Sequence, residues 1–434
     1  MRVMSQSARL PAPIASVVAW RWFPHSACFA VALVIRLAWV LWVDRDGFVL
    51  NDAMMYNANA VAINEGLGFR PPQGGPSAQW PPAYSTILAG IYWLFGIEPL
   101  WGEMFNAIVG AVTVVLLMLL VERVVDRRTA ILAGAMLTVL PGPILWTDVL
   151  VTETLYTAMF VLMMLVLAHA TPSWGWMAAI GAVIGLGALV RGEALTWGLL
   201  PIVLFWRELP RIELVKRIAA AAAVAVVCLL PWTIRNAIVM DAFVPVATNA
   251  SATLWSGHHE GATGGQTYPP EEFYLQFDQE PPLRELQSGA ALRREALEYM
   301  VTNPVHELQL IPLKLIHLNR GDSYALDWVN AAPGAAPIAP INVERIGVLA
   351  DVGYYGLLTL FLLGAVVLGR PFWGTRMGRV IAASFLTGLF LYGFLYYGNY
   401  RYRLPYEPLM VLVAATFLVR LWDWKRAATR VEAG

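Results

Sequence analysis

Long apolar runs dominate this sequence and limit what it can fold into. A helix needs about 20 mostly apolar residues to cross the hydrocarbon core of a membrane. Hydrophobic residues make up 58% of the chain and charged residues only 14%, whereas soluble domains carry about 25% charged residues. We therefore expect an all-α polytopic membrane protein. Its eleven apolar runs lie near 26–43, 82–97, 104–122, 129–145, 152–170, 175–190, 194–206, 217–231, 345–369, 379–397 and 404–422.

The arginines predict which ends of these runs face the cytoplasm, because short loops rich in Lys and Arg stay on that side. All the basic segments can share one side only if one early run does not cross. The run 82–97 is the weakest, since it is short, begins with Pro-Pro and is rich in aromatic residues that suit an interface. About ten helices then cross, both termini are cytoplasmic, and 26–43 is an uncleaved first helix. The basic segments are 2–21, 123–128, 207–217, 370–379 and 425–430.

This topology divides the chain into three parts. Residues 1–231 form an N-terminal catalytic transmembrane module, whose first outer loop is 44–103. Residues 232–344 form an extracytoplasmic segment, with amphipathic helices expected around 284–302 and 304–319. Residues 345–434 supply the C-terminal transmembrane helices and a cytoplasmic tail. No internal repeat is evident, which disfavours a transporter.

Asp52 begins a set of polar residues in the first outer loop. Asp52, Tyr56 and Asn59 are spaced i, i+4 and i+7, so a helix from about 52 to 65 places them on one face. Asp is also a common helix cap, and capping alone would explain Asp52. The functional alternative is a general base that removes a proton from an acceptor.

Glu153 lies at the outer end of the fourth crossing helix, with Asp148 nearby. A carboxylate at such a boundary often only caps the helix. Inside the bundle it would be costly, and a costly charge within a membrane indicates function. The sequence leaves both interpretations open.

Four arginines lie near the outer face, against the positive-inside trend: Arg191, Arg235, Arg401 and Arg403. A guanidinium binds phosphate through two parallel hydrogen bonds. A phosphate at the outer leaflet belongs either to a lipid headgroup or to a lipid-borne substrate. Isolated arginines that extend to the interface are the simpler alternative.

Other polar residues carry weaker signals. Arg36 lies in the middle of the first helix, where a charge requires a partner inside the bundle. His258 and His259 could ligate a metal, although adjacent loop histidines are more often ordinary polar residues. Cys28 and Cys228 lie in apolar runs and predict no disulfide. Nucleotide and zinc motifs are absent, and a net charge of zero argues against a nucleic-acid partner. We expect no cofactor, with a divalent metal left open.

Several motifs occur in a fixed order along the chain. They are "ND" followed by Tyr56, "GLGF", "WPPAYSTILAGIYWLFG", "VTETLY", "GLGALVRGE", "PWTIRNAIVMDAFVPVATNASATLWSG" and "YRYRLPYEPLMVLVAA". In this order, over about residues 30–420, the chain resembles the GT-C membrane glycosyltransferases of the protein O-mannosyltransferase and lipid A aminoarabinose transferase type.

The resemblance implies roles for individual residues. Asp52 corresponds to the general base, and Glu153 to an acidic residue that holds the acceptor or orients the base. Pro81 and Pro82 begin an interfacial helix next to the site, and that helix carries Tyr84. Many relatives have a basic residue or histidine just before the Pro-Pro pair, where it meets the donor phosphate. Gln79 and Trp80 stand there in this chain, so the four outer arginines become the candidates for phosphate binding.

The resemblance also implies an activity. A sugar passes from a polyprenyl-phosphate donor to an acceptor hydroxyl on a glycan, lipid or protein, with inversion at the anomeric carbon. The expected location is a bacterial inner membrane, in contact with membrane lipids and with the site facing the periplasm. Alternatives are a transporter or flippase of polyprenyl-linked glycans, a polymerase or ligase that needs no first-loop carboxylate, and a non-enzymatic scaffold.

Overall fold

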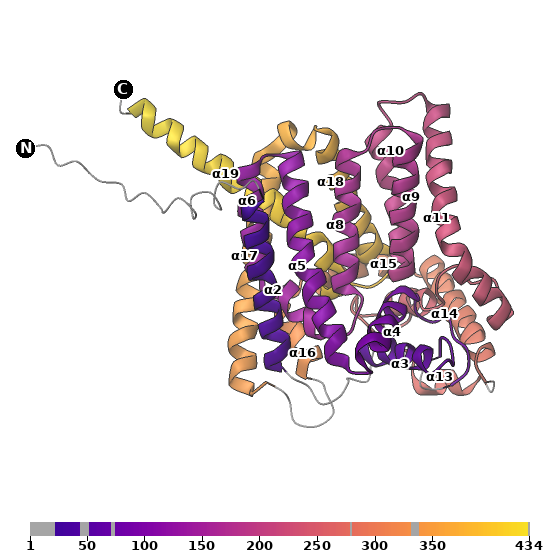
Figure 1. Ribbon diagram of the computed structural model, residues 1–434. Helices are drawn as coiled ribbons and strands as arrows, with labels where there is room; N and C mark the ends of the chain where they lie inside the picture. The colour runs from indigo at the N-terminus through magenta and orange to yellow at the C-terminus, as the bar shows by residue number, and fades with distance from the viewer. Residues whose placement is uncertain (1–21, 44–51, 71–73, 278–279, 331–337, 433–434) are drawn as a thin grey trace, which may run out of the picture.

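The computed structural model describes residues 22–43, 52–70, 74–277, 280–330 and 338–432. These residues form helices joined by loops, and they contain no strand. The all-α prediction is therefore confirmed for the part of the chain that is described. Most of the long helices run side by side as one bundle (Figure 1).

Six helices are long and apolar enough to cross a membrane, and a seventh span arises if the bent pair 127–139 and 141–148 counts as one. The predicted count of ten also requires the crossing of three shorter elements, and it remains a prediction. The six spans are α2 (Phe23–Val43), α5 (Pro99–Val124), α11 (Arg211–Met240), α17 (Pro340–Trp373), Arg376–Leu395 with α18 (Arg376–Phe390), and Tyr400–Thr429 with α19 (Glu407–Glu432). The bent pair is α6 (Arg127–Val139) with α7 (Pro141–Leu145) and η1 (Trp146–Asp148), and the shorter elements are α8 (Glu153–His169), α9 (Trp174–Val190) and η2–α10 (Gly192–Phe205).

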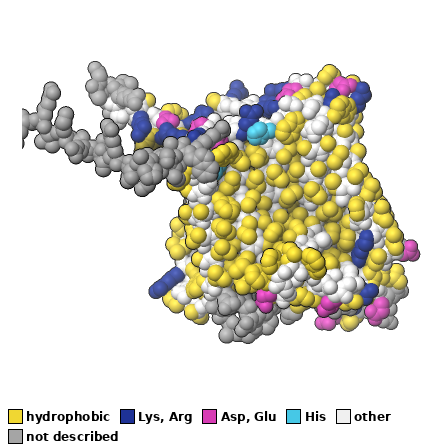
Figure 2. Space-filling view, viewed as in Figure 1, with side chains coloured by type: hydrophobic (Ala, Val, Ile, Leu, Met, Phe, Trp, Pro, Cys, Tyr) yellow, Lys and Arg dark blue, Asp and Glu magenta, His cyan; other side chains and the backbone are white. Residues whose placement is uncertain are grey.

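The bundle has a broad apolar surface. On the face shown in Figure 2, most Lys and Arg side chains gather along the upper edge, above a wide hydrophobic area. That edge carries the connection between α10 (Leu199–Phe205) and α11 (Figure 1). The positive-inside rule predicts such a distribution at the cytoplasmic edge of a membrane protein. The apolar helices and the wide hydrophobic surface show that the chain is an integral membrane protein.

The helix that follows the Pro-Pro pair is short, as the prediction that it does not cross requires. α4 (Ala83–Phe95) has 13 residues, too few to span the hydrocarbon core. It lies beside α3 (Asp52–Asn64) at the end of the bundle opposite the arginine-rich edge (Figure 1). Asn64 Nδ2 donates to Ala89 O at 2.8 Å and Ser85 Oγ donates to Tyr56 O at 3.0 Å, so polar contacts join the two helices.

Residues 232–344, which the sequence predicts to be extracytoplasmic, are also largely helical where the structure describes them. The two amphipathic helices expected from the sequence are present as α14 (Leu283–Thr302) and α15 (Pro304–Leu318). Glu285 of α14 ties this segment to the first outer loop, because its carboxylate accepts from Ser77 Oγ at 2.7 Å and from Thr248 Oγ1 at 2.6 Å. The other short helices are α12 (Ala250–Gly257), α13 (Glu271–Leu275), η3 (Asp322–Tyr324) and α16 (Ala325–Asn330).

Small residues let neighbouring helices approach closely in the core. A Cβ atom on Gly181 or Gly185 of α9 would overlap backbone atoms of Ala221 or Ala225 of α11. Glycine at such positions is typical of membrane helices, whose association depends on close packing of their backbones. The packing fixes α9, and with it Arg191, which directly follows that helix.

Candidate active site

Arg401 joins the two candidate carboxylates. Its Nε atom donates to Glu153 Oε1 at 2.7 Å, and its Nη1 and Nη2 atoms each donate to Asp52 Oδ2 at 3.1 Å. The side chain of Asp52 is 37% exposed, whereas those of Arg401 and Glu153 are 7% and 1% exposed. One carboxylate can therefore meet a ligand, and the other lies behind the guanidinium.

Local structure places these three residues. Asp52 is the first residue of α3 and Glu153 the first of α8, and helix N-termini favour negative charge. Arg401 lies in η5 (Tyr400–Tyr406), a short 3-10 helix that begins after η4 (Leu391–Leu395), the π-helical end of the preceding span. Asn399 caps η5, because its Oδ1 atom accepts from the Arg401 amide at 3.0 Å.

A second arginine contacts the buried carboxylate. Arg191 Nη1 donates to Glu153 Oε1 at 3.0 Å, and Arg191 Nη2 contacts Glu193 Oε1 at 3.5 Å. Three carboxylates and two guanidiniums thus lie together among the described residues. The separate predictions for Asp52, Glu153, Arg191 and Arg401 fall in this one cluster.

Tyr56 and Tyr84 line the cluster from α3 and α4. Their rings meet edge to face, with centroids 5.3 Å apart. The Tyr84 hydroxyl donates to Asn106 Oδ1 at 3.1 Å, and Pro82 directly precedes the helix that carries Tyr84. Burial, and then the charge of Asp52, raise the pKa of Tyr56, which keeps its phenol neutral. Asn59 is fully buried, so its amide does not face a ligand in this conformation.

The other two arginines contact different groups. Arg235 Nη1 donates to Ser77 O at 2.6 Å and Arg235 Nη2 donates to Phe69 O at 3.0 Å, so this side chain supports the first outer loop. Arg403 forms buried ion pairs with Asp322 and Glu407. The structure does not bring Arg235 or Arg403 to Asp52 and Glu153, and protein acceptors already occupy their donors.

Aromatic residues that sequence reasoning missed flank Arg401. The guanidinium carbon of Arg401 lies 4.2 Å from the ring centroid of Trp328 and 5.5 Å from that of Trp146. Cation–π contacts of this kind stabilise a buried guanidinium. A sequence signal for them is lacking, because the two tryptophans belong to distant segments that only the fold brings together.

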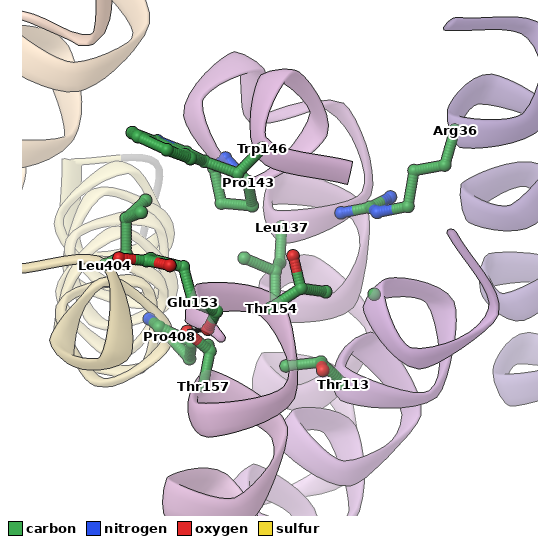
Figure 3. Close-up of a pocket in the computed structure, with 11 residues that line it drawn as sticks. Arg36, Thr113, Leu137, Pro143, Trp146, Glu153, Thr154, Thr157, Leu404 and Pro408 are labelled. Atoms are coloured by element: carbon green, nitrogen blue, oxygen red, sulfur yellow. Dashed lines mark hydrogen bonds between the residues drawn. The ribbon is translucent and has the colours of Figure 1, made fainter. Parts of the chain in front are cut away.

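A small cavity lies behind Glu153 (Figure 3). Arg36 extends toward it from α2, and Gly110 leaves space for the guanidinium, because a Cβ there would lie 2.6 Å from Arg36 Nε. Arg36 Nη1 contacts the Ala32 carbonyl at 3.3 Å, and no ion pair to Arg36 occurs in the described residues. The partner that the sequence leads us to expect for Arg36 is, among the described residues, a backbone carbonyl of its own helix. The cavity has room for a water molecule but not for a sugar.

The adjacent histidines face different partners. His258 Nδ1 lies 2.7 Å from Glu307 Oε2 and His258 Nε2 lies 2.8 Å from Leu395 O. His259 Nδ1 contacts the Trp255 carbonyl at 3.0 Å. Within the described ranges, no group of three or more His, Cys, Asp or Glu residues could hold a metal. This geometry gives the two histidines no shared metal site, and the expectation of no cofactor stays a prediction.

Comparisons with known proteins agree with this fold. Residues 79–234 match the family model described as dolichyl-phosphate-mannose-protein mannosyltransferase. The apo oligosaccharyltransferase of Archaeoglobus fulgidus is similar at 13% identity and a TM-score of 0.55, over 95% of this chain and 52% of that one. The oligosaccharyltransferase AglB from Archaeoglobus fulgidus, in complex with an inhibitory peptide and a dolichol-phosphate, is similar at 13% identity and a TM-score of 0.54, over 94% and 51%.

A third structure, ArnT from Cupriavidus metallidurans bound to undecaprenyl phosphate, has 15% identity and a TM-score of 0.45, over 91% of this chain and 77% of that one. Among curated proteins, none is significantly similar in sequence. The chain spans about half the length of the oligosaccharyltransferases it matches. At these identities the likeness shows the fold, and the GT-C fold expected from the sequence is confirmed.

Proposed function

We propose that this chain is a membrane glycosyltransferase that moves a sugar from a polyprenyl-phosphate-linked donor to an acceptor hydroxyl on the extracytoplasmic side. The match of residues 79–234 to a mannosyltransferase family supports the reaction class. The dolichol-phosphate bound to the similar oligosaccharyltransferase supports the donor class. Acceptor hydroxyls on a protein, a lipid or a glycan all fit this chemistry, and we place the enzyme in a bacterial inner membrane.

The Asp52–Arg401–Glu153 bridge carries the proposal. In the reaction, the acceptor oxygen forms a bond to the anomeric carbon as the bond from that carbon to the phosphate oxygen breaks. Asp52 takes the acceptor proton, and the electron pair of the broken bond leaves with polyprenyl phosphate. A single displacement of this kind inverts the anomeric centre. The partial exposure of Asp52 supports its role, because a general base must reach the proton that it removes.

Arg401 has a double role in this mechanism. In the structure its two Nη atoms contact Asp52 and its Nε atom contacts Glu153. A guanidinium has five donors in a rigid fork that matches phosphate oxygens. We infer that the Nη atoms turn to the donor phosphate when it binds, which frees Asp52 to act as a base. The same donors then stabilise the charge that grows on the leaving phosphate.

Glu153 acts as a positioning residue in this proposal. Its side chain is only 1% exposed, and its Oε1 atom accepts from both Arg191 and Arg401. Such a carboxylate holds two cations in place and is poorly placed to touch an acceptor. Of the two roles that the resemblance implies, the geometry favours orientation over acceptor binding.

The test is sugar transfer by the purified full chain in lipid nanodiscs, with a panel of short-chain polyprenyl-phosphate sugars. We expect wild type to turn over at least one donor and Asp52→Asn to lose about two decades or more. Asp241→Asn is the matched control, since Asp241 is an exposed residue at the end of α11 in the left-handed region that Asn also adopts.

Equal turnover by wild type and Asp52→Asn, with both proteins folded, would remove Asp52 from the mechanism. The arginine-based polymerase or ligase class would then be the better explanation. No turnover of any donor by wild type would favour the transporter alternative.

A further inference from the structure

The extracytoplasmic segment holds the chain that leads into Arg401. We propose that His258, Lys314 and Glu307 form a positioning cluster, which fixes the segment 394–401 and so sets Arg401 between Asp52 and Glu153. The catalytic consequence rests on the function proposed above. The structural part of the proposal, that the cluster restrains the backbone of residues 394–401, does not depend on that function.

Two consecutive backbone carbonyls at the end of η4 are bound by this cluster. Lys314 Nζ donates to Phe394 O at 3.1 Å, and His258 Nε2 lies 2.8 Å from Leu395 O. Both donor side chains are buried, Lys314 at 1% and His258 at 0% exposure. The i→i+5 bonding of η4 leaves its last carbonyls without helical partners. Side chains from α15 and from the residue that follows α12 therefore bind carbonyls that have no partner within the span.

Glu307 completes the cluster from the other side of the imidazole. Its Oε2 atom lies 2.7 Å from His258 Nδ1, and Lys314 Nζ lies 3.3 Å from His258 Nε2. The charged groups facing His258 are thus Glu307 and Lys314, both on α15, while η4 faces it with carbonyls. A buried charge is tolerated when it is paired and hydrogen-bonded, and this arrangement meets that requirement.

The protons of the cluster can occupy two arrangements. A protonated Lys314 donates to Phe394 O and to His258 Nε2, while neutral His258 donates from Nδ1 to Glu307. Alternatively, a neutral Lys314 leaves His258 doubly protonated, and the imidazolium donates to both Glu307 and Leu395 O. Burial lowers the pKa of Lys314 to about 8, and burial followed by the charge of Lys314 lowers the pKa of His258. In both arrangements the cluster carries one shared positive charge opposite Glu307. The first donates to the Phe394 carbonyl through Lys314, and the second donates also to the Leu395 carbonyl through His258 Nε2.

Close backbone contacts also restrain the turn at Gly398, which follows η4. The Gly398 amide donates to Gly264 O at 2.9 Å. A Cβ atom on Gly398 would overlap the Lys314 carbonyl, and one on Gly264 would lie 2.8 Å from the Lys314 amide nitrogen. The backbones of 264, 314 and 398 therefore meet without side chains between them, and the turn has little space in which to shift.

The final step reaches Arg401 itself. Asn399 Nδ2 donates to Gln266 Oε1 at 3.2 Å, and Asn399 Oδ1 accepts from the Arg401 amide at 3.0 Å. A continuous set of contacts thus runs from the buried cluster, through the 398–399 turn, to the backbone of Arg401. Small displacements of a catalytic group can cost about 100-fold in rate, so a residue that holds this turn affects turnover without touching substrate.

The experiment compares four variants of the full chain in nanodiscs. His258→Leu removes the donor to Leu395 O, and His258→Gln restores one at a similar reach. Lys314→Met removes the donor to Phe394 O while leaving the His258–Glu307 pair intact, so it serves if His258→Leu fails to fold. His306→Leu is the matched control. His306 lies on α15, the helix that carries Lys314, but its imidazole contacts the Tyr299 hydroxyl and not the carbonyls of η4.

Two readouts are measured, hydrogen–deuterium exchange of peptides covering 394–402 and turnover against pH. We expect faster exchange in this segment for His258→Leu and Lys314→Met, recovery in His258→Gln, and no change in His306→Leu. In the two variants with faster exchange, turnover should fall about tenfold or more. In wild type, turnover should fall as acid pH protonates His258 beside charged Lys314. His258→Gln should lack that fall and keep only the one caused by protonation of the general base.

If hydrogen–deuterium exchange is unchanged in both His258→Leu and Lys314→Met, the cluster does not restrain residues 394–401, whatever the turnover. Faster exchange with full turnover would overturn the link to Arg401. Absence of turnover in wild type would instead contradict the proposed function, while the exchange data still decide whether the cluster holds the segment.

Discussion

Arg401 and Arg403 lie in the same turn of η5 yet contact different pairs of carboxylates. Arg401 contacts Asp52 and Glu153, and Arg403 contacts Asp322 and Glu407. The guanidinium carbon of Arg403 also lies 3.6 Å from the ring centroid of Tyr354, on α17. Arg403 therefore fixes η5 to η3, α17 and α19, and Arg401 reaches into the candidate active site from that fixed turn.

Arg401→Gln should damage both stability and activity. The variant leaves Glu153 buried with one arginine fewer, and breaking a buried ion pair costs about 3–5 kcal/mol. It also removes the donors proposed to stabilise the leaving phosphate, so turnover should fall about 100-fold or more. Arg401→Lys should recover stability in part but not turnover, because one ammonium cannot bridge two carboxylates as the guanidinium fork does. Thermal melts and donor turnover check this, with exposed Arg294→Gln as the control.

Arg403→Gln should lower stability through a different set of contacts. The variant leaves the buried carboxylates of Asp322 and Glu407 without their cation, at a cost of about 3–5 kcal/mol. Glu407→Gln in the same chain should restore part of this loss, because one uncompensated charge is removed with it. A double-mutant cycle on unfolding in detergent measures the coupling. Strictly additive effects would show that the two side chains do not interact energetically.

Lys314 should make the free energy of unfolding depend on pH in the alkaline range. Its pKa is lowered from 10.5 to about 8 in the folded chain. Between these values the unfolded chain binds the proton and the folded chain does not, so stability rises with pH. The contribution is complete above pH 10.5 and is lost as pH falls through about 8. Melting curves from pH 7.5 to 10 should show this rise in wild type and not in Lys314→Met. The exposed Lys216→Met is the control, and a rise that persists in Lys314→Met would assign it to another group.

Gly398→Ala should disturb the turn before Arg401. The added Cβ would overlap the Lys314 carbonyl, a backbone atom that cannot move aside as a flexible side chain does. Overpacking of this kind costs about 1–3 kcal/mol, and turnover should fall along with stability. Gly356→Ala, where nothing lies within 4 Å of the added atom, should leave both unchanged. Wild-type behaviour in Gly398→Ala would show that the turn can relax freely.

Part of the site was predictable from sequence because its residues are unusual for their surroundings. Asp52, Glu153, Arg191 and Arg401 are charges near the outer ends of apolar runs, and a charge in such a place needs a partner. Their grouping in one cluster needed the fold, since Arg401 and Asp52 are separated by most of the chain. Periodicity alone could not show that Arg403 faces away from Arg401, because η5 is a 3-10 turn rather than a continuation of α19.

The structure places other candidate residues apart from this cluster, for reasons that side-chain geometry explains. Arg235 has the same sequence signature as Arg191, but its guanidinium donates to the backbone carbonyls of Phe69 and Ser77. The pair His258 and His259 left a metal open as an alternative to ordinary polar roles, and the turn that follows α12 directs the two imidazoles to different partners. A sequence gives the kind of side chain at each position, and the direction in which it points depends on contacts that only folding creates.

The position of Arg401 also has a consequence for biosynthesis. Glu153 is the first residue of α8, which the ribosome makes long before it makes η5, the turn that carries Arg401. Until then, of the two arginines that contact Glu153 among the described residues, the nascent chain carries only Arg191, and the contact of Arg401 with Asp52 has not formed. Synthesis of η5 therefore completes the candidate active site. A chain stalled before η5 would keep its early helices and lack the contacts on which the proposed sugar transfer depends.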